Sequence, residues 1–257
     1  MQKRELYRPI NEKYEGEKIM AKMRKQMIRC PKCNAVLEME MWNKLEMPYD
    51  ENQKDKVMNN TFFKVKCDAC GMSLPMMYDF EYNDLERKFL IWVVPQMTEA
   101  EKGRIMNFNK RLETDRALQL AQGGYRYRIV QTDNDLREKV LIFEEGLDDR
   151  FIETMKISYV PVIKKHVGED CKILGFYFDK NEEGKYQWVV VFDKRDPMLL
   201  KVDMNIYHDM KEKMWELAES KTPDGFLVVG AAWALDVMNS PVGKMSKETE
   251  EKNESAR

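Results

Sequence analysis

Two short cysteine motifs constrain the fold more than any other feature of the chain. Each is a Cys-x-x-Cys knuckle, and thirty-three residues lie between the pair Cys30 and Cys33 and the pair Cys67 and Cys70. Paired thiolates at this spacing are ligands that a tetrahedral zinc ion prefers. The sequence therefore predicts one structural zinc ion, Zn(2+), per chain, with no coordination position left for a substrate.

The residues around the knuckles predict two β-hairpins. Strand-like runs over 26–29 and 61–66 lead into the knuckles, and the residues that follow the knuckles are Asn34 and Gly71. These two residue types adopt most readily the left-handed backbone conformation that a tight turn needs. The pattern predicts a zinc ribbon over residues 26–80. Because the two motifs lie further apart than the usual 15 to 20 or so residues, we expect a short helix over residues 50–60 between the hairpins.

Other roles for the four cysteines remain open at this stage. Four sulfur ligands bind iron as well as zinc. A thiol redox protein also uses Cys-x-x-Cys pairs, but catalytic pairs usually begin a helix that lowers the thiol pKa, and strands are predicted here. Structural disulfides need an oxidising compartment, and no apolar signal segment is recognisable near Met1. Zinc is the predicted metal, with iron or thiol redox chemistry as alternatives.

The fifth cysteine, Cys171, begins an apolar run and is predicted to be a buried, reduced thiol. A nucleophilic cysteine needs a histidine as its base. The two histidines of the chain, His166 and His208, fall in no catalytic pattern with it. Phosphate-binding loops and Ser-His-Asp sets are also missing from the sequence. The sequence therefore gives no support for an enzyme.

Composition narrows the class of protein. The chain has 257 residues, with 43 basic and 45 acidic side chains and a formal net charge of −2. This balance argues against a protein that binds nucleic acid over its whole surface. No apolar run is long enough to span a membrane. We therefore expect a cytoplasmic protein without a membrane partner.

Beyond the ribbon, alternating strand and helix patterns predict an α+β protein in which the ribbon is fused to a mixed α/β body. Strands are predicted over 87–94, 125–131, 171–179 and 186–193, and helices are predicted to begin at Thr98, Asp133, Asp148 and Asp203. Gly123-Gly124 should end the first of these helices, and Pro161 should break or kink the third. The predicted organisation is a basic arm (1–25), a ribbon-containing domain (26–195), a helical segment that docks on the core (196–243) and a disordered tail (244–257).

Several stretches outside the ribbon carry a resemblance to a known family. The most specific are Leu136-Arg137-Glu138-Lys139-Val140 and the run from Phe143 to Glu153, supported by Tyr78-Asp79, Lys88-Phe89-Leu90-Ile91-Trp92, Tyr127-Arg128-Ile129-Val130 and both knuckles. Together they resemble the bacterial CpXC-domain proteins over roughly residues 27–193. The resemblance implies the fold and a four-cysteine metal site. It implies no activity, because the family is known for those cysteines rather than for a reaction.

An acidic cluster lies within the most specific stretch. Its members are Glu138, Glu144, Glu145, Asp148, Asp149 and Glu153. Paired carboxylates can bind a divalent metal or act in acid–base catalysis. Acidic residues at a helix start also cap backbone amides, and Glu138 and Glu153 can pair with Arg128 or Arg150. We interpret the cluster as structural.

Two functions from different classes fit these features. The first is a protein-interaction or regulatory module with an unknown protein partner, which is the hypothesis we prefer. The second is a zinc ribbon that binds nucleic acid, since residues 1–29 carry nine basic and four acidic side chains interleaved with Tyr7 and Tyr14. Its candidate contacts are Lys18, Lys22, Arg24, Lys25 and Arg29. A thiol redox protein is the third alternative.

Overall fold

The computed structural model describes residues 23–240, which divide into two compact units. The first unit contains the chain up to Arg137 together with Asp224–Leu227, and the second contains Glu138–Pro223 and the chain from Val228. This division falls inside the range 26–195 that the sequence assigned to one domain, and the predicted boundaries stay predictions. The arm up to residue 22 and the tail 244–257 lie outside the described residues.

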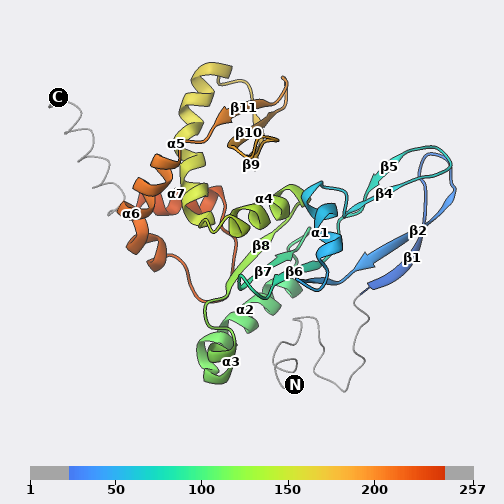
Figure 1. The fold of residues 1–257 in the computed structure, drawn as a ribbon, viewed down its shortest axis with the longest axis horizontal. Helices are drawn as coiled ribbons and strands as arrows, with labels where there is room; N and C mark the ends of the chain where they lie inside the picture. Colours follow the sequence, from blue (N-terminus) through green and yellow to red (C-terminus); the bar gives the residue numbers. More distant parts are fainter. Residues whose placement is uncertain (1–22, 241–257) are drawn as a thin grey trace. The chain divides into compact units, whose positions relative to one another are not determined.

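The first unit begins with two antiparallel hairpins. β1 (Met23–Arg29) pairs with β2 (Val36–Trp42), and β4 (Lys64–Lys66) pairs with β5 (Ser73–Pro75). Between them in the sequence lies α1 (Glu51–Met58), in the range predicted for a helix (Figure 1). The predicted pair of hairpins is confirmed. β4 is shorter than the predicted run 61–66. The Lys64 N–H donates to the Thr61 carbonyl, and the turn that this bond closes occupies the start of the run.

A mixed five-stranded sheet forms the body of the first unit. In the order β12-β8-β7-β6-β3, its strands are Phe226–Leu227, Arg126–Val130, Phe89–Val93, Phe80–Asp84 and Lys44–Met47. β6 is antiparallel to β7 and parallel to β3, while β7, β8 and β12 are parallel. Every residue of β6 and β7 is buried, as expected for inner strands that are covered on both faces. The sequence predicted β7 and β8 but missed β3 and β6.

The connection between the parallel strands β7 and β8 contains two helices, α2 (Glu99–Thr114) and α3 (Arg116–Ala121). The predicted capping box of Thr98 and Glu101 is present at the start of α2. The prediction of one helix up to Gly123 is wrong, because the Asp115 carboxylate accepts the N–H groups of Ala117 and Leu118 and so begins a second helix.

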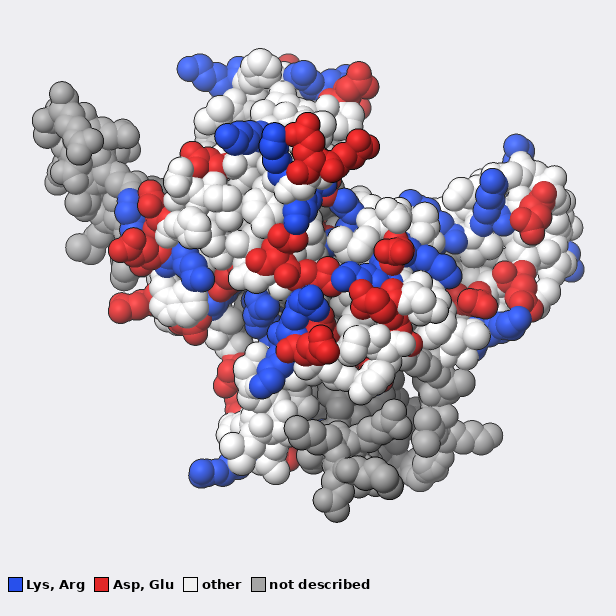
Figure 2. Space-filling view, viewed as in Figure 1, with Lys and Arg blue, Asp and Glu red and all other residues white. Residues whose placement is uncertain are grey.

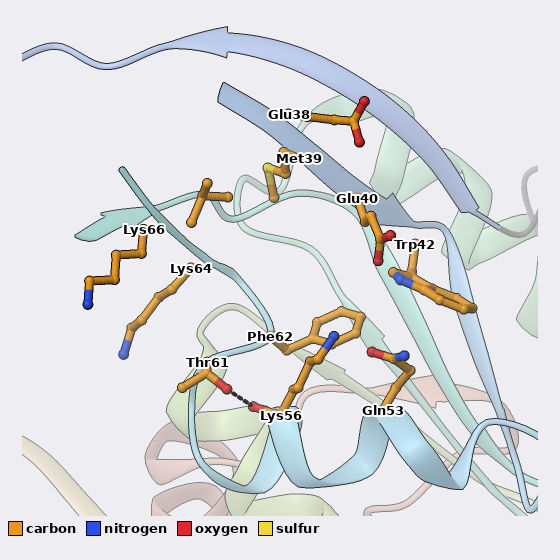
Figure 3. Close-up of a pocket in the computed structure, with 11 residues that line it drawn as sticks. Glu38, Met39, Glu40, Trp42, Gln53, Lys56, Thr61, Phe62, Lys64 and Lys66 are labelled. Atoms are coloured by element: carbon orange, nitrogen blue, oxygen red, sulfur yellow. Dashed lines mark hydrogen bonds between the residues drawn. The ribbon is translucent and has the colours of Figure 1, made fainter. Parts of the chain in front are cut away.

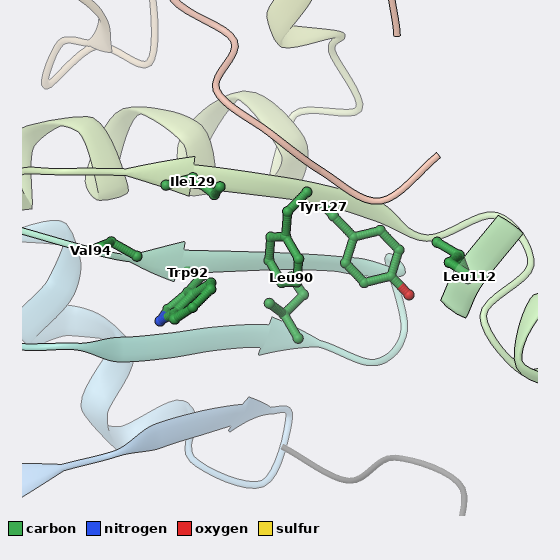
Figure 4. Packing of buried hydrophobic residues seen from close by; sticks show 7 residues of the cluster. Leu90, Trp92, Val94, Leu112, Tyr127 and Ile129 are labelled. Carbon is green, nitrogen blue, oxygen red and sulfur yellow. The ribbon is translucent and has the colours of Figure 1, made fainter. Parts of the chain in front are cut away.

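One face of this sheet forms an apolar core that α2 covers. Figure 4 shows this cluster, with labelled side chains from β7, from β8 and from the connection between them. The cluster consists of Leu90, Trp92, Val94, Leu112, Tyr127, Ile129 and Phe226. Phe226 comes from the short edge strand β12, so a segment almost one hundred residues beyond β8 in the sequence completes this core.

The second unit combines helices with a three-stranded antiparallel sheet in the order β11-β10-β9. Its elements after α4 (Asp133–Glu144) are α5 (Asp149–Val167), β9 (Ile173–Lys180), β10 (Tyr186–Phe192), β11 (Met198–Lys201), α6 (Met204–Ser220) and α7 (Ala231–Asn239). α5 packs against α6 and α7. The helix continues through Pro161, so a break there, the first of the two predicted effects, does not occur. Among the described residues, no helix is both long and apolar enough to cross a membrane.

Candidate metal centre

The two knuckles form the same backbone turn. In the first, the Cys30 N–H donates to the Ala35 carbonyl at 2.9 Å and the Asn34 N–H donates to the Cys30 carbonyl at 2.8 Å. In the second, the Gly71 N–H donates to the Cys67 carbonyl at 2.7 Å, as Asn34 does in the first. Asn34 has φ of 61° and Gly71 has φ of 70°, as their residue types predict. Each turn directs its two cysteine side chains toward the other hairpin.

The four cysteine sulfurs lie together. Cys30 Sγ is 3.6 Å from Cys70 Sγ, Cys33 Sγ is 3.6 Å from Cys67 Sγ, and all four sulfurs lie within 4.8 Å of one another. A tetrahedral ion with metal–sulfur bonds of about 2.3 Å separates its ligands by about 3.8 Å. Each short distance joins one cysteine of each knuckle, so a bound ion would tie the two hairpins together. The donor set therefore fits a single tetrahedral metal ion.

Hydrogen bonds prepare this site for anionic sulfur. The N–H groups of Cys33 and Lys32 point at the Cys30 sulfur and lower the pKa of that thiol to about 6. At Cys33 the Ala35 N–H acts in the same direction, but burial and the neighbouring sulfurs together raise the pKa of the thiol. One thiolate therefore forms readily and opposes ionisation of its neighbours. Only a cation at the centre makes four thiolates favourable together.

The apolar core around the cysteines is small. Apart from Cys30 and Cys67, its buried members are Leu37 and Leu74. Partly buried neighbours complete it: Ile28, Ala35, Val65, Cys70 and Met72. A pair of hairpins with so little buried apolar surface is marginal without a further constraint. The metal ion would therefore supply much of the folding free energy of this ribbon.

The candidate nucleic-acid contacts are spread over the first strand. Lys18 and Lys22 lie outside the described residues. Arg24, Lys25 and Arg29 are exposed on β1, where the alternation of a strand puts Arg24 on the opposite face from the other two. Lys25 Nζ lies 2.6 Å from Glu38 Oε1. On the face that Figure 2 shows, basic and acidic side chains are interspersed, and nucleic-acid binding stays a prediction.

Cys171 is buried in the second unit, as predicted. It is 7% exposed and packs in a cluster with Ile163, Val190 and Phe192. Nothing brings it into the four-sulfur group, whose members all belong to the first unit.

The acidic cluster is a buried charge network rather than an open site. Lys139 Nζ lies 3.0 Å from both Asp149 Oδ2 and Glu153 Oε1, and Lys156 Nζ lies 3.0 Å from the same Glu153 oxygen. Lys156 Nζ also lies 2.7 Å from Glu138 Oε1. Burial raises the pKa of Glu138 to about 7. The predicted partners of Glu138 and Glu153 are wrong, because neighbouring turns of α4 and α5 bring lysines to them.

Asp148 has the structural role that the sequence predicts. Its carboxylate accepts the Arg150 N–H at the start of α5 and also lies 2.7 Å from the Arg150 guanidinium. Glu145 lies outside the buried network. Glu145 pairs instead with Lys180 at 2.8 Å. The cluster is therefore divided between helix capping and ion pairs.

Comparison with known proteins agrees with this geometry. No curated protein and no solved structure gives a significant match to the chain. The sequence model described as CpXC protein matches residues 28–156, which is half of the chain and includes all four knuckle cysteines. By this match the chain belongs to the CpXC protein family.

Proposed function

We propose that the four cysteines hold one structural Zn(2+) ion and that the protein acts as a protein-interaction or regulatory module. The observation that carries this proposal is the approach of four sulfurs from two knuckles to within 4.8 Å of one another. A tetrahedral ion bound by all four has no free coordination position, so a substrate cannot bind to it. The ion would hold the two hairpins in place, and the surfaces of the protein would carry the function.

Zinc is favoured over iron by the kind of fold that surrounds the sulfurs. Four-cysteine sites on paired hairpin knuckles are the structural zinc sites of ribbon folds, although tetrahedral sulfur also suits iron. A reducing compartment such as the cytoplasm keeps such thiols free for metal binding, and we therefore propose a cytoplasmic location.

Exposed apolar side chains on the ribbon support an interaction role. Met27 on β1 is 61% exposed, and Val36 at the start of β2 is 52% exposed. Tyr49, in the turn before α1, is 68% exposed. Aromatic side chains and methionine are enriched at protein interfaces. The proposed partner is another protein.

Metal content per chain is the measurement that tests this proposal. Untagged protein purified without a chelator should contain one zinc ion per chain, and its four knuckle thiols should resist a thiol reagent until a chelator removes the metal. Iron in place of zinc would contradict the metal assignment. A metal-free protein whose knuckle thiols oxidise reversibly would refute the proposal in favour of redox chemistry.

A further inference from the structure

A groove of about 350 Å³ lies between the two hairpins and α1 of the first unit. Figure 3 shows its walls: β2 on one side, β4 on the other, and α1 with the following turn below. The side chains that line it come from all three elements: Glu38, Met39, Glu40, Trp42, Gln53, Lys56, Thr61, Phe62, Lys64, Val65 and Lys66. Its volume lies within the range of ligand pockets, about 300 to 1,000 Å³.

β2 presents an unpaired edge to this groove. It pairs only with β1 among the described strands. In an antiparallel pair, opposite residues alternate between hydrogen-bonded and non-hydrogen-bonded pairs. The Cys30 N–H donates to the Ala35 carbonyl, so these two residues form a hydrogen-bonded pair. Five positions further along the register, Lys25 and Glu40 therefore form a non-hydrogen-bonded pair. The N–H and C=O groups of Glu40 therefore point away from β1, toward the groove. The same holds for Trp42, whose N–H donates to the Tyr78 hydroxyl at 3.3 Å.

β4 presents an unpaired edge in the same way. Its only strand partner among the described residues is β5. The Cys67 N–H bonds to the Met72 carbonyl, so Lys66 and the residue opposite it, Ser73, do not bond to each other. The outward backbone groups belong to Lys66, and its side chain lines the groove. Two strand edges thus face one space, and an added strand could bond to both.

The charges on the two walls are opposite. Glu40 lies on the β2 wall, Lys66 lies on the β4 wall, and Lys56 extends from α1 below. Within the part of the chain that the structure describes, none of these three side chains forms an ion pair. The apolar side chains of Met39 and Phe62 line the groove between them, and both are largely buried. An occupant that alternates charged and apolar side chains would match both the walls and the floor.

A buried acceptor in the groove also lacks a partner. The Gln53 side chain is 9% exposed and extends from α1 into the groove. Among the described residues, Gln53 Oε1 accepts no hydrogen bond. A buried acceptor without a partner is energetically costly, and a donor from a bound molecule would relieve that cost.

We propose that this groove binds an extended segment of a partner protein, which adds as a strand between β2 and β4. The segment has apolar side chains at alternate positions, and between them a basic residue for Glu40 and an acidic residue for Lys66. The inference rests on the proposed role as an interaction module and names the site and the chemistry of the partner. One end of each strand edge lies beside a knuckle, so a metal ion bound by the four cysteines would hold the two edges in place.

Proline variants test the contacts that the β2 edge makes. Short random peptides displayed on phage are selected on the zinc-loaded protein, and the enriched peptides are measured by fluorescence anisotropy. In Glu40→Pro the groove edge loses the Glu40 carboxylate and an N–H that β1 does not use. Lys25→Pro, directly opposite in the register, removes an N–H on the outer edge of β1 and is the matched control. We expect binding about tenfold weaker in Glu40→Pro and unchanged in Lys25→Pro.

Charge reversal tests the side-chain contacts. Lys66→Glu should weaken the enriched peptides by severalfold, and peptides whose acidic residue is replaced by lysine should regain the affinity. A variant that had merely lost its structure would not recover affinity for the altered peptide. Full recovery supports the groove, and loss of binding to both peptides in a variant that still holds its metal overturns it.

Other outcomes also decide between the proposals. Absence of enriched peptides, or equal binding by both proline variants, overturns the groove while leaving the zinc-bound module intact. If peptides bind only after residues 1–22 are removed, that segment itself occupies the groove, and the proposal of a partner protein is overturned. If the protein forms dimers and the Glu40→Pro variant does not, a second copy of the chain occupies the groove instead, and the proposal of a partner protein is overturned. A protein without metal refutes the proposed function, and metal content is measured on every variant for that reason.

Discussion

Removal of the metal should unfold the ribbon while leaving the five-stranded sheet intact. Cys67→Ser is the sharpest perturbation, because Cys67 is fully buried and lies 3.6 Å from its partner sulfur on the other knuckle. Serine keeps the size of the side chain and replaces a zinc-binding thiolate with a hydroxyl that stays protonated.

The expected magnitude follows from the small ribbon core. Its two buried leucines, Leu37 and Leu74, contribute about 1.5 to 3 kcal/mol each. Structural zinc sites contribute about 10 to 16 kcal/mol. The ion therefore outweighs the apolar contacts, and the hairpins should not remain folded without it. The sheet keeps a separate core around Leu90 and Trp92, which contains no cysteine.

Hydrogen exchange and limited trypsin digestion measure this difference. In Cys67→Ser, or after chelation of the wild type, we expect rapid exchange in β1, β2, β4 and β5 and cleavage after Arg24, Lys25 or Arg29. Exchange in β7 and β8 should stay slow. Cys171→Ser is the matched control, since it changes a buried cysteine outside the sulfur group and should leave ribbon exchange unaltered. A ribbon that stays protected without metal would refute the reasoning.

Three further predictions concern the rest of the chain. Lys139→Met leaves the buried carboxylates of Asp149 and Glu153 short of a cation and should lower the free energy of unfolding by about 3 to 5 kcal/mol in urea; a loss below about 1 kcal/mol would contradict a buried network. The pKa of Glu138 lies near 7 in the folded state, above its ordinary value of 4.5. Between pH 4.5 and about pH 7, the folded state therefore binds more protons than the unfolded state. The contribution of Glu138 to stability should therefore fall as pH rises through this window, and the difference in unfolding free energy between wild type and Glu138→Gln at pH 5 and pH 7.5 measures it; a rise with pH would show the opposite sign. Asp115→Ala removes the cap of α3 and should destabilise the first unit by about 1 kcal/mol, with faster hydrogen exchange confined to α3, whereas unchanged exchange there would mean that the cap is dispensable.

Features that depend on neighbours in the sequence were predictable. The knuckle turns, the capping box at Thr98 and the Asp148 cap involve residues within a few positions of one another. Strand β7 was recognisable because all its residues are apolar. In such cases the local pattern and the tertiary environment favour the same structure.

Features that depend on distant partners were missed. β6 contains Glu81, Asn83 and Asp84, three polar residues that do not indicate a buried strand, yet all are at most 2% exposed. The strand forms because β3 and β7 pair with both of its edges. Asp84 is accommodated there by hydrogen bonds from the N–H groups of Glu86 and Arg87. Tertiary pairing overrides the low strand propensity of these residues.

The sequence by itself determined the candidate metal ligands and the shape of each knuckle, because two cysteines three positions apart and the turn after them form a local unit. The structure confirms the predicted meeting of the two knuckles, and it alone decided that β2 and β4 leave two edges facing a groove. It also decided which lysines neutralise Glu138 and Glu153. The physical reason is that contacts between distant segments depend on how the hairpins and helices pack, and a local pattern of residues carries no record of that packing.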